Sequence, residues 1–208
     1  MLTALVLLPA RGALATALVP GVRSAKITAI GASFVTLALT IVLALQFELG
    51  GPLYQMTEQV TWIEPLGLSW SLGLSGISLA LVALTAVATP IVLGAMWREA
   101  DASGRSPKAY YALVLSLQAM VIGAFLATDV LLFYILFEAM LIPMYFLIGV
   151  YGGEKRQYAA MKFLLYNLFG GLLMLAAVIG LYLQSPEGER TFSLAELVAL
   201  DIDSSTQG

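Results

Sequence analysis

The chain contains no cysteine and no histidine among its 208 residues. The usual protein ligands of zinc, haem iron and iron–sulfur clusters are therefore missing, and no disulfide can form. Charged residues are also scarce, at 11% of the chain against about 25% in a soluble domain. A net charge of −3 argues against a nucleic-acid partner. These absences exclude a disulfide-stapled, zinc-binding or nucleic-acid-binding protein.

Apolar residues are abundant, at 60% of the chain, and the mean hydropathy is +0.92. We therefore expect an all-α, polytopic transmembrane helical bundle that forms one membrane domain over residues 1–208. The first apolar segment lacks the features of a cleaved signal peptide and is expected to be retained as an anchor. The pattern predicts about six spans, over residues 2–22, 27–47, 72–96, 110–127, 130–150 and 159–183.

Loop charges predict the orientation of the bundle. The basic residues gather in alternate loops, at Arg23, Lys26, Arg98, Arg105, Lys108, Lys155 and Arg156. The long loop between the second and third spans instead carries Glu48, Glu58 and Glu64, without Lys or Arg. It also contains an amphipathic patch with Trp62 and Trp70. The positive-inside rule places the basic loops in the cytoplasm, so both termini are expected on the outer, periplasmic side.

Residues 184–208 are expected to form an outer amphipathic segment and a polar tail. Pro186 and Gly188 are predicted to end the last span. Ser193 and Glu196 have capping-box spacing before an apolar stretch. A short helix on the outer interface and an ordinary loop helix are both consistent with this pattern. Residues 201–208 are expected to be disordered.

Glu138 is the only charged residue in the fifth predicted span, residues 130–150. At about 1.5 Å of rise per residue, this span covers roughly 30 Å, the thickness of the hydrocarbon core of a bilayer. A carboxylate in the middle of the membrane is costly unless it faces protein or a wet cavity. Glu138 is therefore the first candidate functional residue, and a permanent bond to one structural partner is the alternative interpretation.

Three neighbours support a functional role for Glu138. Tyr134 and Tyr145 share its helical face and can supply hydroxyl groups. Pro143 has no N–H, so the carbonyl of Ala139 beside Glu138 loses its helical hydrogen bond. Such a weakened helix can admit water, which predicts a group that loads and releases protons.

Lys162 lies near the cytoplasmic end of the sixth predicted span, with Tyr158 and Tyr166 one turn away on its face. A role in a proton relay and simple snorkelling to the headgroups are about equally consistent with its position. Asp129 is expected to cap the fifth span at its N-terminus. Gly170 and Gly171 are expected to allow close helix packing.

Several motifs carry a resemblance to a known family. Around Glu138 the sequence reads FEAMLIPMYFLI, over residues 137–148. It continues as YGGE over residues 151–154 and as YAAMKFLLY over residues 158–166, with WIEPLG (62–67) and GLSGIS (73–78) upstream. Together these segments closely resemble subunit M, or chain 4, of NADH-quinone oxidoreductase. Antiporter subunits of multisubunit cation/proton exchangers and of membrane-bound hydrogenases share the helix that contains Glu138.

The resemblance implies a proton-translocating membrane subunit of respiratory complex I. Glu138 would be an essential proton-channel residue and Lys162 part of the relay, with Tyr134, Tyr145 and Pro143 in support. The chain would hold no redox centre, because NADH, FMN, iron–sulfur clusters and quinone belong to partner subunits. The other membrane subunits, the lipid bilayer and protons would be its partners, and a bacterial plasma membrane its location. A subunit of a cation/proton antiporter or membrane-bound hydrogenase is the alternative, and a membrane scaffold without transport is a weaker one.

Two features depart from the family pattern. Ser75 stands where the family commonly has aspartate, which puts any role of that carboxylate in doubt. The family also has a second, inverted repeat of helices and a seventh-helix lysine that pairs with the glutamate. The chain is therefore expected to be an N-terminal fragment or a partial gene product.

Overall fold

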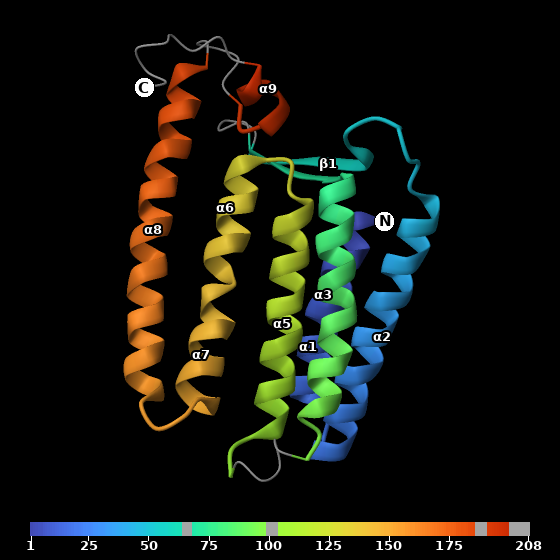
Figure 1. Cartoon of the computed structure of the whole chain (residues 1–208), viewed down its shortest axis with the longest axis vertical. Coiled ribbons are helices and arrows are strands. Elements are labelled where there is room, and N and C mark those ends of the chain that lie inside the picture. The colour runs from blue at the N-terminus through green and yellow to red at the C-terminus, as the bar shows by residue number, and fades with distance from the viewer. Residues whose placement is uncertain (64–67, 99–103, 186–190, 200–208) are drawn as a thin grey trace.

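The computed structural model describes residues 1–63, 68–98, 104–185 and 191–199. Long helices run roughly along one axis and reverse direction at the two ends of the bundle (Figure 1). They are α1 (Leu2–Leu18), α2 (Val22–Gln46), α3 (Gly76–Ala95), α5 (Pro107–Leu126), α6 (Val130–Ala139), α7 (Leu141–Tyr151) and α8 (Arg156–Gln184). A hairpin of β1 (Gln55–Ile63) and β2 (Leu68–Leu74) lies across one end, together with the short α9 (Leu194–Val198).

Five segments are long and apolar enough to cross a membrane: α2, α3, α5, α6 taken together with α7, and α8. The sixth, α1, has 17 residues, about 25 Å of helix, and is slightly shorter than a bilayer core. It ends at Leu18 rather than at residue 22, and α2 begins at Val22 rather than at residue 27. The chain is thus a multi-pass, mainly helical membrane protein, as the composition predicts.

The β-hairpin overturns the expectation of an amphipathic patch followed by a helix that starts at Leu72. Residues 68–74 read LSWSLGL, which alternates polar or small residues with large apolar ones, the period of a strand. Leu68, Leu72 and Leu74 have buried side chains. Leu72 and Leu74 therefore belong to β2, and α3 begins at Gly76 behind a serine cap.

The turn between α5 and α6 is held from both sides by backbone hydrogen bonds. On one side the Thr128 N–H donates to the Ser71 carbonyl of β2 over 3.0 Å, and the two side-chain hydroxyls lie 2.7 Å apart. On the other side the Val130 N–H donates to the Phe192 carbonyl over 2.9 Å. The start of α6 is therefore fixed between the hairpin and the segment that leads into α9.

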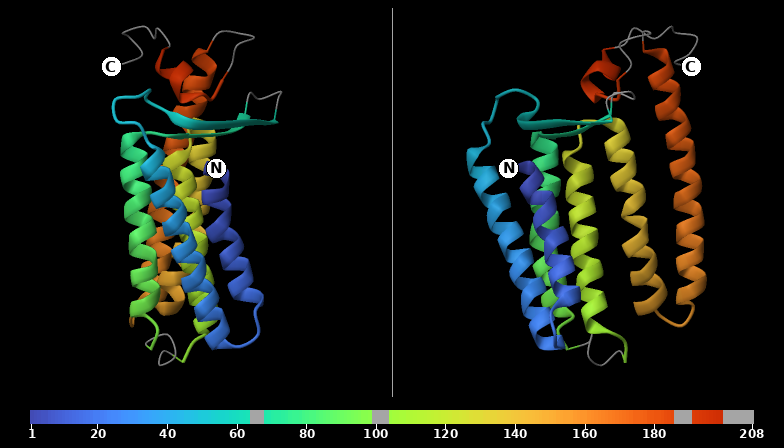
Figure 2. Two further views of the ribbon diagram at one scale, coloured as in Figure 1. Left: turned by 90° about the vertical axis from the view of Figure 1, so that its right-hand side faces the viewer. Right: turned by 180° about the vertical axis from the view of Figure 1, so that it is seen from behind.

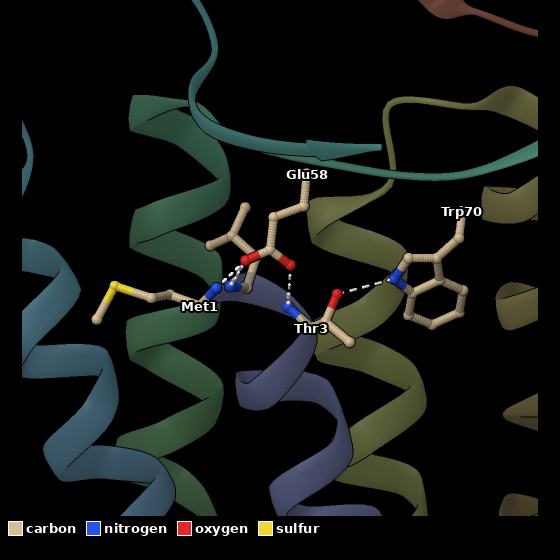
Figure 3. Close-up of polar contacts among 5 residues, drawn as sticks. Met1, Thr3, Glu58 and Trp70 are labelled. Atoms are coloured by element: carbon tan, nitrogen blue, oxygen red, sulfur yellow. Dashed lines mark hydrogen bonds and ion pairs between the residues drawn. The ribbon is translucent and has the colours of Figure 1, made fainter. Parts of the chain in front are cut away.

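Glu58 joins the hairpin to the first helix (Figure 3). The backbone N–H groups of Leu2 and Thr3 each donate to its carboxylate over 2.9 Å, and the terminal ammonium of Met1 pairs with it. Nearby, the Trp70 indole N–H donates to the Thr3 hydroxyl over 3.0 Å. β1 has an irregular register between Gln55 and Glu58, and such bulges redirect side chains. Glu58 thus caps α1 from a distant strand, which satisfies free N–H groups at the helix start.

The largest buried clusters lie among α1, α2, α3, α5 and the hairpin, and Leu132 at the start of α6 joins the first of them. One cluster, near the hairpin, includes Leu5, Leu43, Leu72 and Ile122. The second is built from Ala13, Ala29, Leu93, Tyr111 and Leu115. The helices α6, α7 and α8 lie to one side of this core (Figures 1 and 2).

Charge separates between the two ends of the bundle. The α1–α2 and α7–α8 turns lie at the end opposite the hairpin (Figure 2), where Arg23 begins α2, Lys155 precedes α8 and Arg156 begins α8. Glu48 and Glu58 belong to the hairpin end, where the N-terminus and α9 also lie. The predicted alternation of basic and acidic loops is therefore present, while Glu64 lies outside the described residues.

The α9 segment packs on the bundle instead of standing free of it. Phe192 and Leu197 are buried, and the Phe192 ring stacks on Tyr182 with 4.4 Å between centroids. Ser193 occupies the N-cap position, but its side chain makes no capping bond, so the predicted capping box is not formed. Pro186, Gly188 and residues 201–208, for which a helix end and a polar tail are predicted, lie outside the described part of the chain.

Candidate functional site

Asp129 fixes the beginning of the helix that carries Glu138. Its side chain accepts from the N–H groups of Leu131 and Leu132 over 3.0 and 2.9 Å, so the predicted N-cap is confirmed. The Ser69 N–H of β2 donates to the other oxygen over 3.4 Å. Burial raises the pKa of Asp129, and these three N–H donors oppose that rise. The cap thus joins the start of α6 to strand β2 of the hairpin and fixes the position of that helix.

The predicted fifth span is irregular at Met140, two residues after Glu138, although Met140 keeps helical backbone angles and its N–H still donates to the Leu136 carbonyl over 3.1 Å. α6 ends at Ala139, Met140 forms the junction, and α7 begins at Leu141. Pro143 then falls in the first turn of α7, where a missing N–H is tolerated. The weakened helix expected from Pro143 is therefore observed, and it lies next to the carboxylate. By helical rise Glu138 stands roughly 14 Å from Asp129 and roughly 20 Å from Tyr151, within the central part of the span.

The Glu138 carboxyl group points at α8. Its Oε1 atom is buried and has no hydrogen-bond partner among the described residues. A β-carbon added to Gly171 of α8 would overlap Oε1 and lie 2.7 Å from Cδ. The carboxyl group therefore rests directly against the backbone of α8, in a place that only glycine leaves free. A buried oxygen without a donor is a costly arrangement for an anion, and protonation or a water molecule would relieve it.

The two predicted tyrosines do not hydrogen-bond to Glu138 in the described structure. Tyr134 lies one turn before Glu138 on the same face of α6. The Tyr145 hydroxyl instead donates to Met161 Sδ of α8 over 3.7 Å. Tyr134 thus remains a neighbour of the site, while Tyr145 helps to join α7 to α8.

Lys162 lies on the face of α8 that points away from Glu138. Gly171 follows it by nine residues, which at about 100° per residue places the two on opposite sides of the helix. The Lys162 side chain is exposed, and its Nζ lies 6.0 and 5.7 Å from the ring centroids of Tyr158 and Tyr166. The predicted tyrosine flanks are confirmed. The structure does not bring Lys162 and Glu138 together.

Two further polar positions have structural surroundings that the sequence analysis did not predict. Ser75 forms a reciprocal capping box with Ser78 at the start of α3, so the serine has a structural use where the family commonly has aspartate. Gln118 of α5 is 2% exposed, and neither of its amide atoms has a partner among the described residues. Ser75 shows the S-x-x-S spacing of a cap, whereas nothing in the sequence marks Gln118.

Comparison with known proteins places this arrangement in a family. Residues 127–206 match the family described as NADH:quinone oxidoreductase/Mrp antiporter, TM. NADH-quinone oxidoreductase subunit M of Mycobacterium tuberculosis is 44% identical over 95% of this chain and 41% of its own length. The chain thus spans about two fifths of that relative.

Solved structures agree with the sequence comparison. A chain of respiratory complex I from Thermus thermophilus superposes with a TM-score of 0.82 at 29% identity, over 98% of this chain and 40% of its own. A chain of the Mrp complex from Dietzia gives a TM-score of 0.73 at 23% identity, over 100% of this chain and 21% of its own, and shows the shared fold alone.

The multi-pass helical fold and the family match place the chain in the antiporter-like class of membrane subunits. Within that class, this chain belongs to the NADH:quinone oxidoreductase/Mrp antiporter family.

Proposed function

We propose that this chain is a proton-translocating membrane subunit of a respiratory NADH:quinone oxidoreductase, and that Glu138 takes up and releases the proton. One observation carries the proposal: the Glu138 carboxyl lies in mid-span, close to the helix irregularity at Met140, with a buried oxygen that has no partner among the described residues. An ionisable group held in this way has a reason to change its protonation state. A permanently paired structural glutamate does not.

The residues around Glu138 divide the work of such a site. Pro143 has no N–H, so the carbonyl of Ala139 lacks its helical donor, and this carbonyl can hold water beside the carboxyl group. Such water can carry protons to and from Glu138. Lys162 lies on the opposite face of α8, so it acts on Glu138 only indirectly, if it belongs to the relay. The Asp129 cap keeps α6 in place while the junction changes its hydration.

Electron transfer belongs to other subunits in this proposal. The chain has no cysteine or histidine to ligate a cluster or haem, and NADH, FMN and quinone would bind to partner subunits. Its partners would be the other membrane subunits of the complex in a bacterial plasma membrane. The 44% identity to a subunit M supports this branch of the family.

The test is Glu138→Gln, introduced into the gene that encodes this chain and assayed in the purified complex in proteoliposomes. We expect an assembled complex whose proton translocation per electron is abolished or severely reduced, because the amide cannot exchange a proton. Glu138→Asp should be milder. Glu154→Gln, an exposed glutamate in the turn before α8, is the matched control and should pump normally. Normal stoichiometry in Glu138→Gln would overturn the assignment.

A secondary cation/proton antiporter subunit is the second candidate function, because the matched family includes Mrp antiporters. The two functions differ in what drives the protons. In proteoliposomes, proton movement that requires NADH and quinone supports the oxidoreductase. Proton movement driven by a sodium gradient without NADH supports the antiporter.

The orientation of the bundle is a proposal of the same kind. The basic end would face the cytoplasm by the positive-inside rule. The absence of native cysteine makes single-cysteine labelling clean. A cysteine at Leu49, 95% exposed at the hairpin end, should react with an impermeant thiol reagent from outside, and a cysteine at Glu154 should not. The reverse pattern would invert the topology.

A further inference from the structure

Gly171 is the residue of α8 that faces the Glu138 carboxyl group. It is buried, and a β-carbon built on it would overlap Glu138 Oε1 and lie 2.7 and 3.3 Å from Cδ and Oε2. Real β-carbons do not approach heavy atoms below about 3.0 Å, so any side chain here must move the carboxyl group or the helix. The three atoms nearest to this β-carbon all belong to the Glu138 carboxyl group, so a side chain at 171 would clash with that group.

The neighbouring glycine provides an internal contrast. Gly170 is exposed, and a β-carbon built on it would meet nothing within 4 Å. Both glycines occupy the interior of α8, so both lack the helix-favouring side chain of alanine. The requirement for glycine at 171 therefore comes from the carboxyl group, not from the backbone of α8.

We propose that Gly171 is a positioning residue for the proton-carrying carboxyl group, and this rests on the function proposed above. By lacking a side chain it lets the Glu138 carboxyl group reach the backbone of α8, which removes Oε1 from solvent and fixes the side chain beside the junction at Met140. A methyl group at 171 would push the carboxyl group toward the junction or away from α8. Displacement of a reacting group by about 1 Å can cost on the order of 100-fold in rate.

The experiment compares Gly171→Ala with Gly170→Ala in the intact complex. Gly170→Ala should assemble and pump as the parent does. Gly171→Ala should lower proton translocation about tenfold or more and shift the pH dependence of pumping, because the carboxyl group acquires new surroundings. A change in packing alone would not shift the pH dependence. Equal effects of the two variants, or an unchanged pH profile in Gly171→Ala, would overturn the proposal.

A second variant keeps the test decisive when Gly171→Ala assembles poorly. Glu138→Asp shortens the side chain by one methylene and withdraws the carboxyl group from position 171. The double variant Gly171→Ala/Glu138→Asp should therefore regain assembly and part of the pumping lost in Gly171→Ala. No recovery in the double variant would refute the contact between these two positions.

The two proposals fail separately. Normal pumping in Glu138→Gln would refute the proposed function of Glu138. Rescue of assembly by Glu138→Asp in the Gly171→Ala background would still establish the steric contact between residues 138 and 171. Conversely, normal pumping in Gly171→Ala would refute the positioning role of Gly171. The role of Glu138 would then still be decided by Glu138→Gln.

Discussion

The two sides of the bundle are packed very differently. On one side, the buried shares of the apolar stretches of α2, α3 and α5 are 28%, 33% and 44%, and α5 also packs against α6 and α7. On the other side, the corresponding shares are 17% for the span formed by α6 and α7 and 11% for α8. The well-packed side is built from continuous helices over two buried clusters. The sparsely packed side contains the broken helix, Glu138 and Lys162.

This difference separates support from chemistry. Packing that is dense and satisfied has little freedom to change, so it suits a scaffold. In the proposed function, the carboxyl group of Glu138 needs a place that water can reach, and Pro143, which withholds a donor from the Ala139 carbonyl, offers one on the sparsely packed side. The two sides meet where α5 packs against α6 and α7, and the hairpin and Asp129 hold the turn from α5 to α6 in place. The scaffold thus fixes one end of the helix whose other end carries the site.

The largest effect on stability should come from truncating the packed side. Leu115 is fully buried in α5, and Leu115→Ala should lower the free energy of unfolding by about 2–5 kcal/mol through lost contacts and a cavity. Leu172 of α8 is 53% exposed, and Leu172→Ala should change it by no more than about 0.5 kcal/mol. Denaturation of the purified protein in mixed micelles measures both. Similar losses at the two positions would contradict the division between the sides.

A smaller effect is expected at the link between the hairpin and α1. Glu58→Ala removes the acceptor for two backbone N–H groups and should cost about 0.5–2 kcal/mol, the value of a helix cap. The ion pair with the Met1 ammonium is partly exposed and adds little. Glu58→Gln keeps one acceptor oxygen and should lose less. If high salt lowered the free energy of unfolding of the parent protein by as much as Glu58→Ala does, the ion pair with Met1 would be the main contribution of Glu58 instead of the helix cap.

The smallest effect is expected at Lys162. Because it lies on the face of α8 opposite Gly171, Lys162→Met should reduce pumping only partly, while Lys162→Arg keeps the charge and should pump close to normally. Proton translocation measured across the neutral pH range tests this prediction. Unchanged pumping in Lys162→Met would leave snorkelling as the role of this lysine. A loss as complete as that of Glu138→Gln would require a contact absent from the described structure.

Local patterns predicted the elements that depend on local sequence. Apolar runs located the spans to within a few residues, Asp129 was recognisable as a cap, and Pro143 indicated the weakened helix after Glu138. The hairpin was hidden because its strand β2 runs straight into the apolar stretch of α3, although the alternation in LSWSLGL was a usable signal. The short α1 is explained by Pro20 and by Gly21 at a φ of 86°, which end it early.

Contacts between helices distant in sequence were beyond such patterns. A glycine pair in a membrane helix indicates close packing, but only the fold shows that Gly171 meets a carboxyl group and Gly170 meets nothing. Tyr134, Glu138 and Tyr145 were predicted to share one helical face, but only the fold shows that the Tyr145 hydroxyl is taken up by Met161 of α8. Counting residues along α8 shows that Lys162 and Gly171 lie on opposite faces of the helix. Only the position of α6 shows that Lys162 therefore points away from Glu138.

The central claim is that Glu138 itself gains and loses a proton during turnover. Infrared difference spectra of the complex, recorded as NADH drives the protein between its resting and reduced states, observe carboxyl groups directly. The account predicts a protonated-carboxyl band that disappears in Glu138→Gln, shifts in Glu138→Asp and in Gly171→Ala, and is unchanged in Glu154→Gln. A spectrum of Glu138→Gln identical to that of the parent would contradict it.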